Sequence, residues 1–158
     1  MSTVYLGLGS NLGDKQMFIK KALALITERV GVILALSGIY ETEPWGYDSP
    51  EMYQNVATVI RTDLEPATLL TVIQAIEREI GRNHKTTNGQ YHDRVIDIDI
   101  LLYDDLILQT ATLTIPHPLM HRRVFVLQPL SEIAPHIIHP VLKKSIAALL
   151  RFEMKDEG

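Results

Sequence analysis

The chain has 158 residues, 46% of them hydrophobic and 22% charged, which is the balance of a single globular domain rather than a disordered segment. Its net charge of -4 excludes a general basic surface for nucleic acid or an anionic membrane, so an anionic substrate needs a local group of Arg, Lys, backbone N–H groups or metal. The absence of cysteine excludes disulfides and thiolate metal sites.

The first elements along the chain are a predicted strand, a helix and a second strand. Residues 3–9 have the composition of a short strand and run into a turn rich in Gly, Asn and Asp at 9–14. A helix is expected next, because apolar residues recur at helical spacing as far as Val30 and Gly31 is a natural terminator. Residues 32–40 then predict a second strand.

Two predicted loops flank the next strand and helix. Residues 43–50 carry two prolines and a glycine, which predicts a loop and a candidate lid. A third strand over 53–62 and a second helix from Pro66 to Gly81 follow. The polar stretch 82–94 has no apolar period, so we expect a second, mobile loop there.

The C-terminal part completes the expected topology. Residues 95–103 predict a fourth strand, prolines divide the following stretch into short pieces, and a final helix is expected near 145–152. The order strand, helix, strand, strand, helix, strand is that of a ferredoxin-like α+β sandwich, an antiparallel sheet with helices on one face and the other face partly open. With no long apolar run and no signal-peptide pattern after Met1, we expect one cytoplasmic domain over 1–158.

Two aspartates stand out in the predicted fourth strand. They alternate with the aliphatic residues Ile96, Ile98, Ile100 and Leu102. Side chains along a strand point to opposite faces in turn, so the aliphatic residues should face the helices and both carboxylates should share the open face. Asp97 and Asp99 would then be like charges roughly 7 Å apart, which repel each other unless a cation lies between them. Oxygen-only ligands suit magnesium rather than zinc, although two aspartates can also simply solvate an edge strand.

Several polar residues elsewhere are candidate ligand contacts. Gln74 and Glu77 are neighbours on the second helix, where they can read a base edge such as adenine or form an ordinary solvated flank. Arg82 and Arg94 bracket the polar loop, and an Arg fork matches phosphate oxygens, although a single loop arginine is usually just solvated. His117, between two prolines, and Arg123 are further candidates for phosphate contact.

The early glycines and the last two histidines are interpreted as structural. The segment GLGSNLG at 7–13 is neither a dinucleotide-binding motif nor a Walker A motif, which favours a tight turn with close backbone approach. His136 and His139 have no carboxylate nearby in the sequence with which to complete a metal site.

Five segments in a fixed order carry a family resemblance. They are LGLGSNLGD at 6–14, YETEPWG at 40–46, DRVIDIDILL at 93–102, IPHP at 115–118 and FVLQPL at 125–130. Together they resemble the 6-hydroxymethyl-7,8-dihydropterin pyrophosphokinases of folate biosynthesis, over nearly the whole chain from about residue 3 to 140.

The resemblance implies a ferredoxin-like α+β fold and an ATP-dependent transfer of the β,γ-diphosphate to the hydroxymethyl group of the pterin, with release of AMP. It implies two Mg²⁺ ions that bind with ATP on Asp97 and Asp99, and a triphosphate held by Arg82 and Arg94. The residues implied to surround ATP are Gln74, Glu77, Ile100, Thr112, Thr114, His117 and Arg123. The residues implied to form the pterin pocket are Gly9, Thr42, Glu43, Pro44, Trp45, Tyr53, Asn55 and Phe125. ATP and the pterin are then the expected partners of a monomer that binds neither nucleic acid nor a membrane.

The chain departs from the family pattern within 82–94. The family commonly has Arg-Trp-Gly-Pro-Arg before the aspartate strand, where this chain has QYHDR, and His84 and Lys85 stand where a second loop arginine is expected. Tyr91 is expected to take the place of the tryptophan, and Lys85 or His92 to reach phosphate.

Two other functions fit parts of the sequence. One is a non-catalytic ferredoxin-like binding module, either a small-molecule sensor or an RNA-binding domain. An RNA-binding domain would need exposed aromatics on its central strands and a basic face, whereas the net charge of this chain is -4. Another magnesium-dependent nucleotide phosphotransferase or hydrolase would use the same aspartate pair.

Overall fold

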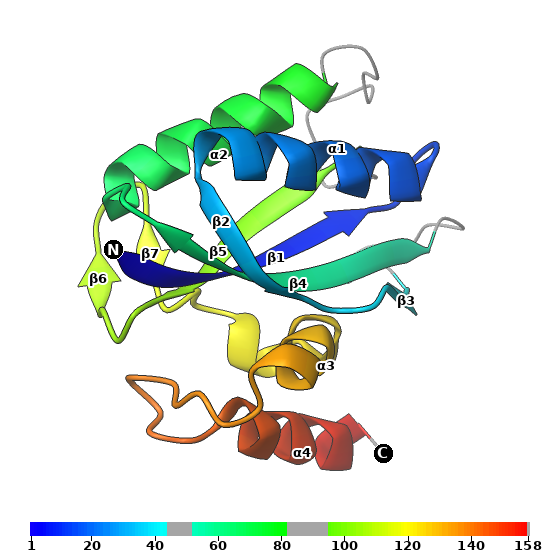
Figure 1. Cartoon of the computed structure of the whole chain (residues 1–158). Coiled ribbons are helices and arrows are strands. Elements are labelled where there is room, and N and C mark those ends of the chain that lie inside the picture. The colour runs from blue at the N-terminus through cyan, green and yellow to red at the C-terminus, as the bar shows by residue number, and fades with distance from the viewer. Residues whose placement is uncertain (44–51, 82–94, 158) are drawn as a thin grey trace.

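In the computed structural model, which describes residues 1–43, 52–81 and 95–157, an antiparallel sheet lies between two layers of helices (Figure 1). The strands of this sheet are β1 (Ser2–Ser10), β2 (Gly31–Leu36), β3 (Tyr40–Thr42), β4 (Tyr53–Thr62) and β5 (Asp97–Tyr103). The helices are α1 (Lys15–Arg29), α2 (Pro66–Gly81), α3 (Val124–Ile133), α4 (Ile146–Glu157) and the 3₁₀ helix η1 (Met120–Arg122). A separate hairpin consists of β6 (Leu108–Gln109) and β7 (Thr114–Ile115).

The strand order β2-β4-β1-β5 confirms the expected ferredoxin-like α+β fold. Every pairing in the sheet is antiparallel, β2 and β5 end this order, and the short strand β3 pairs with β4. The helices α1 and α2 lie side by side over one face, as predicted (Figure 1).

The prediction of one strand over 32–40 is wrong in detail, because β2 ends at Leu36 and β3 begins at Tyr40. Ser37 donates its N–H to the Ala57 carbonyl oxygen at 2.9 Å, and its Oγ accepts from the Ala57 N–H at 2.9 Å. The Ser37 side chain therefore takes the place of a backbone acceptor for the Ala57 N–H, and the regular pairing of β2 with β4 ends there.

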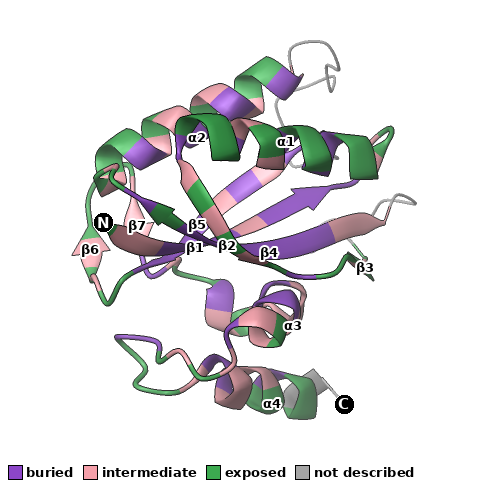
Figure 2. Cartoon of the chain, in the orientation of Figure 1, coloured by how far each residue is buried: buried purple, intermediate pink, exposed green. Residues whose placement is uncertain are grey.

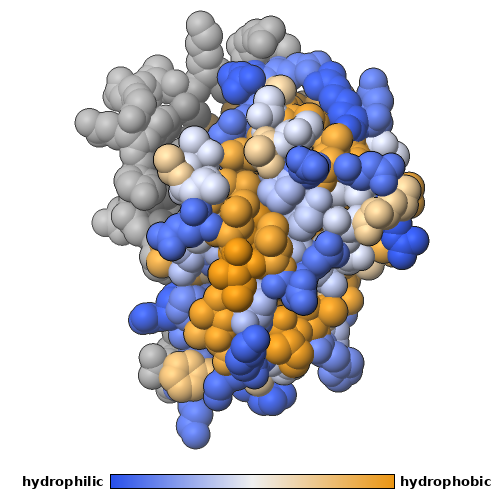
Figure 3. Space-filling model, turned by 90° about the vertical axis from the view of Figure 1, so that its left-hand side faces the viewer, coloured by the Kyte–Doolittle hydropathy of each residue, from blue (hydrophilic) through white to orange (hydrophobic). Residues whose placement is uncertain are grey.

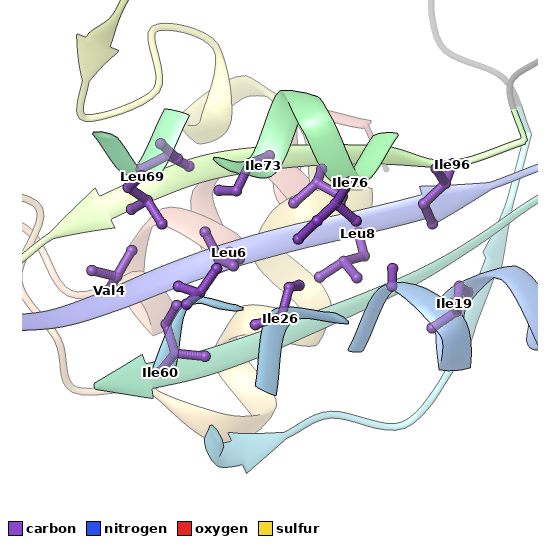
Figure 4. Packing of buried hydrophobic residues seen from close by; sticks show 14 of the residues in the cluster. Val4, Leu6, Leu8, Ile19, Ile26, Ile60, Leu69, Ile73, Ile76 and Ile96 are labelled. Atoms are coloured by element: carbon purple, nitrogen blue, oxygen red, sulfur yellow. The ribbon is translucent and has the colours of Figure 1, made fainter. Parts of the chain in front are cut away.

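The larger core lies between the sheet and the helices α1 and α2 (Figures 2 and 4). The apolar stripe predicted for α2 is buried as expected: Leu69, Ile73, Ile76 and Ile80. In α1 the buried residues are Phe18, Ile19, Ala22 and Ile26. The Asp14 side chain accepts from the Met17 N–H at 3.2 Å and caps this helix at its start. The 3.6-residue periodicity therefore predicted both helices and the faces that they bury.

The opposite face of the sheet is covered in part by α3 and α4, below the sheet in Figure 1. The sequence predicted only short pieces here, because Pro129 lies within α3 and prolines disfavour helix interiors. Burial of Val126, Leu127 and Leu130 against the sheet outweighs this local preference. The final helix also runs further than expected, from Ile146 to Glu157.

Leu102 lies on the face opposite to the one that alternation predicted. It belongs to the cluster under α3 and α4, whereas Ile98 and Ile100 belong to the cluster under α1 and α2. The reason is a β-bulge: Tyr5 pairs with Leu102 and Leu6 pairs with Ile100, so one extra residue is inserted in β5 and the later side chains change face. None of the helices in the described part of the chain is long and apolar enough to cross a membrane.

Candidate active site

A row of paired residues crosses the sheet on the face that carries α3. Gly9 pairs with Asp97 of β5 on one side and with Asn55 of β4 on the other, and Asn55 pairs in turn with Tyr40 of β3. Alternation from Ile98, which is buried under α2, places Asp97 on the opposite face, as predicted. Both Asp97 and Asp99 are half-buried in β5.

The centre of this row has no side chain, because it is Gly9. A Cβ added there would stand 2.9 Å from Asn55 Oδ1 and 3.3 Å from Tyr53 Cδ1. The Asn55 amide is held from its other side, since its Nδ2 donates to Thr42 Oγ1 at 2.8 Å and to the Tyr40 carbonyl oxygen at 3.5 Å. The carbonyl can only accept, so this orientation points the Asn55 oxygen toward the space over Gly9. The fold thus brings together four of the predicted pterin residues: Gly9, Thr42, Tyr53 and Asn55.

His117 is held beside this row by backbone hydrogen bonds. Its N–H donates to the Leu101 carbonyl oxygen at 3.0 Å, and its Nδ1 accepts from the Leu119 N–H at 3.2 Å. Burial, and after it the nearby Arg123 cation, lower the pKa of His117 from 6.5 to about 4, although the Asp97 carboxylate acts in the opposite direction. The ring is therefore neutral at pH 7, and its Nε2 carries the proton that can be donated to a ligand.

Arg123 and Phe125 lie next to each other at the start of α3. The Arg123 Cζ atom lies 5.6 Å from the centroid of the Phe125 ring, which is cation–π distance. The charges of Arg123 and Asp97 both act on His117, so both side chains lie within electrostatic reach of this histidine. The fold thereby places an arginine, a neutral histidine donor and a carboxylate together, although they are far apart in the sequence.

A hollow of about 230 Å³ borders His117 next to the hairpin β6–β7. Its lining includes the apolar residues Ile115, Pro116 and Val141, together with His139. Figure 3 looks onto this side of the molecule and shows apolar surface running down it between hydrophilic residues. These apolar walls are consistent with burial being the largest cause of the low pKa of His117.

The free energy of unfolding is expected to decrease as the pH falls from about 6.5 to about 4, because His117 resists protonation only in the folded state. In that range the unfolded chain binds the extra proton, so the loss from this residue is about 3 kcal/mol at most. Urea titrations at pH 7 and pH 4.5 measure it. His117→Asn, whose Oδ1 can still accept from the Leu119 N–H, should lose less stability over the same range. Burial also lowers the pKa of His139, but this residue is present in both proteins, so its contribution to the loss of stability cancels in the comparison. Equal losses would contradict the prediction.

Two of the predicted nucleotide residues, Glu77 and Ile100, lie at β5, the edge strand of the sheet. There the Glu77 Oε2 atom accepts from the Ile98 N–H at 2.7 Å, so the carboxylate satisfies an edge group that has no strand partner. The Ile100 side chain is buried in the core, which leaves only its backbone for a ligand. Both α2, which carries an exposed Gln74, and β7, which begins at the half-buried Thr114, contact β5.

The remaining predicted residues are divided between the surface and the segments that the structure leaves out. Thr112 is exposed beside the hairpin, and Glu43 is exposed after β3. The residues that lie outside the described ones are Pro44, Trp45, Arg82, His84, Lys85, Tyr91, His92 and Arg94. The sequence analysis missed Leu119, whose N–H orients His117, and Glu132, whose carboxylate contacts Tyr40 from α3. The Tyr40–Glu132 hydrogen bond joins residues 92 positions apart, and no local pattern predicts such a contact.

The family model described as 7,8-dihydro-6-hydroxymethylpterin-pyrophosphokinase (HPPK) matches residues 5–135. The chain is 50% identical over 141 residues to the 2-amino-4-hydroxy-6-hydroxymethyldihydropteridine pyrophosphokinase of Porphyromonas gingivalis, covering 89% of this chain and 95% of the relative. It is 41% identical over 146 residues to the enzyme of the same name from Aquifex aeolicus, covering 92% and 89%.

Solved structures show the same fold. The crystal structure of wild-type Plasmodium falciparum HPPK-DHPS matches with a TM-score of 0.78 and 18% identity. The match covers 99% of this chain and 46% of the solved one, so the chain spans less than half the length of that protein. By the family model and the curated relatives, the chain belongs to the 7,8-dihydro-6-hydroxymethylpterin-pyrophosphokinase family and is an ATP-dependent pyrophosphokinase of folate synthesis.

Proposed function

We propose that the row through Asp97, Gly9 and Asn55 binds 6-hydroxymethyl-7,8-dihydropterin and presents its hydroxymethyl group to ATP beside Asp97. One observation carries this proposal: a bare glycine lies between an oriented amide and a carboxylate on adjacent strands. A flat heterocycle can approach the sheet only where no Cβ stands in its way. We further propose that residues 1–158 form a single catalytic domain around this site.

The pterin edge and faces are assigned as follows. Asn55 Oδ1 accepts from the amino and ring N–H groups of the pterin, while Thr42 keeps the amide in place. Tyr53 borders the ring at Gly9, and Phe125 and Trp45 supply aromatic faces for stacking. Glu43 and Pro44 complete the pocket after β3.

Two Mg²⁺ ions are assigned to Asp97 and Asp99. The donor set fits them, because magnesium in nucleotide sites takes one or two carboxylates and fills its other positions with water and phosphate oxygens. When bound, the metal neutralises phosphate charge and orients the polyphosphate.

ATP is assigned to the space between His117 and the outer edge of β5. The His117 Nε2–H group and the Arg123 guanidinium donate to phosphate oxygens, and Arg82 and Arg94 hold the triphosphate. The base and ribose lie along β5, against Gln74, the Ile100 backbone, Thr112 and Thr114. Glu77 contributes by holding the β5 backbone through the Ile98 N–H.

The reaction is an in-line displacement at the β-phosphorus. The pterin hydroxyl oxygen forms a bond to this phosphorus, the bond to the oxygen that bridges the α-phosphorus breaks, and AMP leaves with that oxygen. The hydroxyl proton is released. The chain contributes orientation of both substrates and donors for the developing phosphate charge, so catalysis is mainly positioning and electrostatics.

The test is an assay of the purified chain with ATP, magnesium and 6-hydroxymethyl-7,8-dihydropterin. We expect AMP and pterin diphosphate in equal amounts, and no AMP without the pterin. Binding of the pterin without AMP formation would favour a binding module, and nucleotide cleavage without the pterin would favour a hydrolase. We further propose that the enzyme is monomeric and cytoplasmic, and size-exclusion chromatography with light scattering tests the first point.

A further inference from the structure

The Glu132 carboxylate of α3 joins that helix to the connection between β2 and β3. Its Oε1 accepts from the Tyr40 hydroxyl at 2.6 Å, and both of its oxygens lie 3.2 Å from the Gly38 N–H. The hydrogen bond to Glu132 is the largest cause of a raised pKa for Tyr40. One carboxylate therefore holds Gly38 of the connection and Tyr40, the first residue of β3, which are 94 and 92 residues away in the sequence.

Besides the contacts of Glu132, the strand β3 that follows this connection is held, among the described residues, by its pairing with β4 and by a 3.2 Å hydrogen bond from Gln54 Nε2 to Glu41 Oε1. β3 is three residues long and pairs with β4 in the sheet. Yet two of its groups orient Asn55: the Tyr40 carbonyl oxygen and Thr42 Oγ1 both accept from the Asn55 Nδ2 atom. A shift of β3 would turn or release the Asn55 amide, whose oxygen faces the space over Gly9.

We propose that Glu132 is a positioning residue for the pterin subsite, which it serves by fixing β3 and through it the Asn55 amide. The inference rests on the proposed placement of the pterin over Gly9. Glu132 is exposed, and its hydrogen bond goes to Tyr40 of β3. Asn55 in turn donates to Tyr40 and Thr42 of the same strand, so Glu132 acts on Asn55 through β3. Replacing Glu132 should therefore change the KM for the pterin and leave the KM for ATP nearly unchanged, because the residues assigned to ATP lie along β5 and at His117.

The experiment compares steady-state kinetics of Glu132→Ala and Glu132→Gln with the wild type. In Glu132→Ala the KM for the pterin should rise about tenfold, while the KM for ATP stays within about twofold and kcat within about threefold. Glu132→Gln keeps one oxygen that can accept from the Tyr40 hydroxyl, so it should recover most of the pterin affinity. The control is Glu79→Ala, which removes the 2.7 Å ion pair between α2 and Arg29 of α1 without touching β3. It should leave both KM values unchanged.

A double-mutant cycle with Thr42→Val separates positioning from general stability. If Glu132 acts through β3 and Asn55, Glu132→Ala should add little to the pterin KM of Thr42→Val. An unchanged pterin KM in Glu132→Ala, an equal rise of both KM values, or full additivity would each overturn the inference. A wild-type chain that forms no AMP would overturn the proposed function instead, and calorimetric binding of the pterin to the same variants would still decide the role of Glu132.

Discussion

Replacing Asp97 by asparagine is expected to lower kcat/KM by at least about a thousandfold, roughly 4 kcal/mol of transition-state stabilisation. The variant loses one of the two carboxylates assigned to magnesium, and this carboxylate is the one next to the proposed attacking hydroxyl. Asp97 raises the pKa of His117, so its removal leaves this histidine neutral at pH 7. The loss therefore cannot come from a change in the charge of His117. Steady-state AMP formation, over a range of magnesium concentrations, is the measurement.

Asp105→Asn is the matched control for this prediction. Asp105 is exposed in the turn just after β5, at the opposite end of the strand from Asp97, so the same chemical change is made away from the site. We expect its activity to stay within about twofold of the wild type, since exposed charges contribute little. Asp97→Asn activity within tenfold of the wild type, in a protein with an unchanged melting temperature, would rule out the assigned role of Asp97.

Gly9→Ala is expected to raise the KM for the pterin by about fiftyfold and to change the KM for ATP little, a cost of roughly 2 kcal/mol in pterin binding. The added Cβ would stand 2.9 Å from Asn55 Oδ1, closer than such contacts occur. The Asn55 amide must then shift, which disturbs its hydrogen bond to Thr42, and the methyl group also fills the floor of the proposed pocket. Substrate titrations at saturating ATP give this value directly.

Gly7→Ala makes the same change two residues away on the same face of β1. There the nearest atom to the added Cβ is Leu101 Cδ1 at 3.4 Å, an ordinary van der Waals contact. We expect the pterin KM of this variant to remain within about threefold of the wild type. Similar effects of the two substitutions would mean that β1 as a whole, rather than the space over Gly9, determines the activity.

The sequence by itself determined the helices α1 and α2, the presence of a final helix, most of the strands of the sheet, the topology and the family. Leu69, Ile73 and Ile76 recur at helical spacing, and the face that they form is buried as predicted. Alternation along the fourth predicted strand correctly separated Asp97 from its aliphatic neighbours. These features depend on neighbours within a few residues, which is the distance over which periodicity and turn chemistry act.

The tertiary structure decided the rest, because it depends on partners that are distant in the chain. The bulge that turns Leu102 to the other face arises from its register against β1, and α3 forms around Pro129 because the sheet buries its apolar side. The low pKa of His117 and the link from Glu132 to β3 likewise come from groups that only folding brings together. A proline in a helix interior costs about 3 kcal/mol and other local preferences cost less, so in these two places burial and register outweigh local propensity.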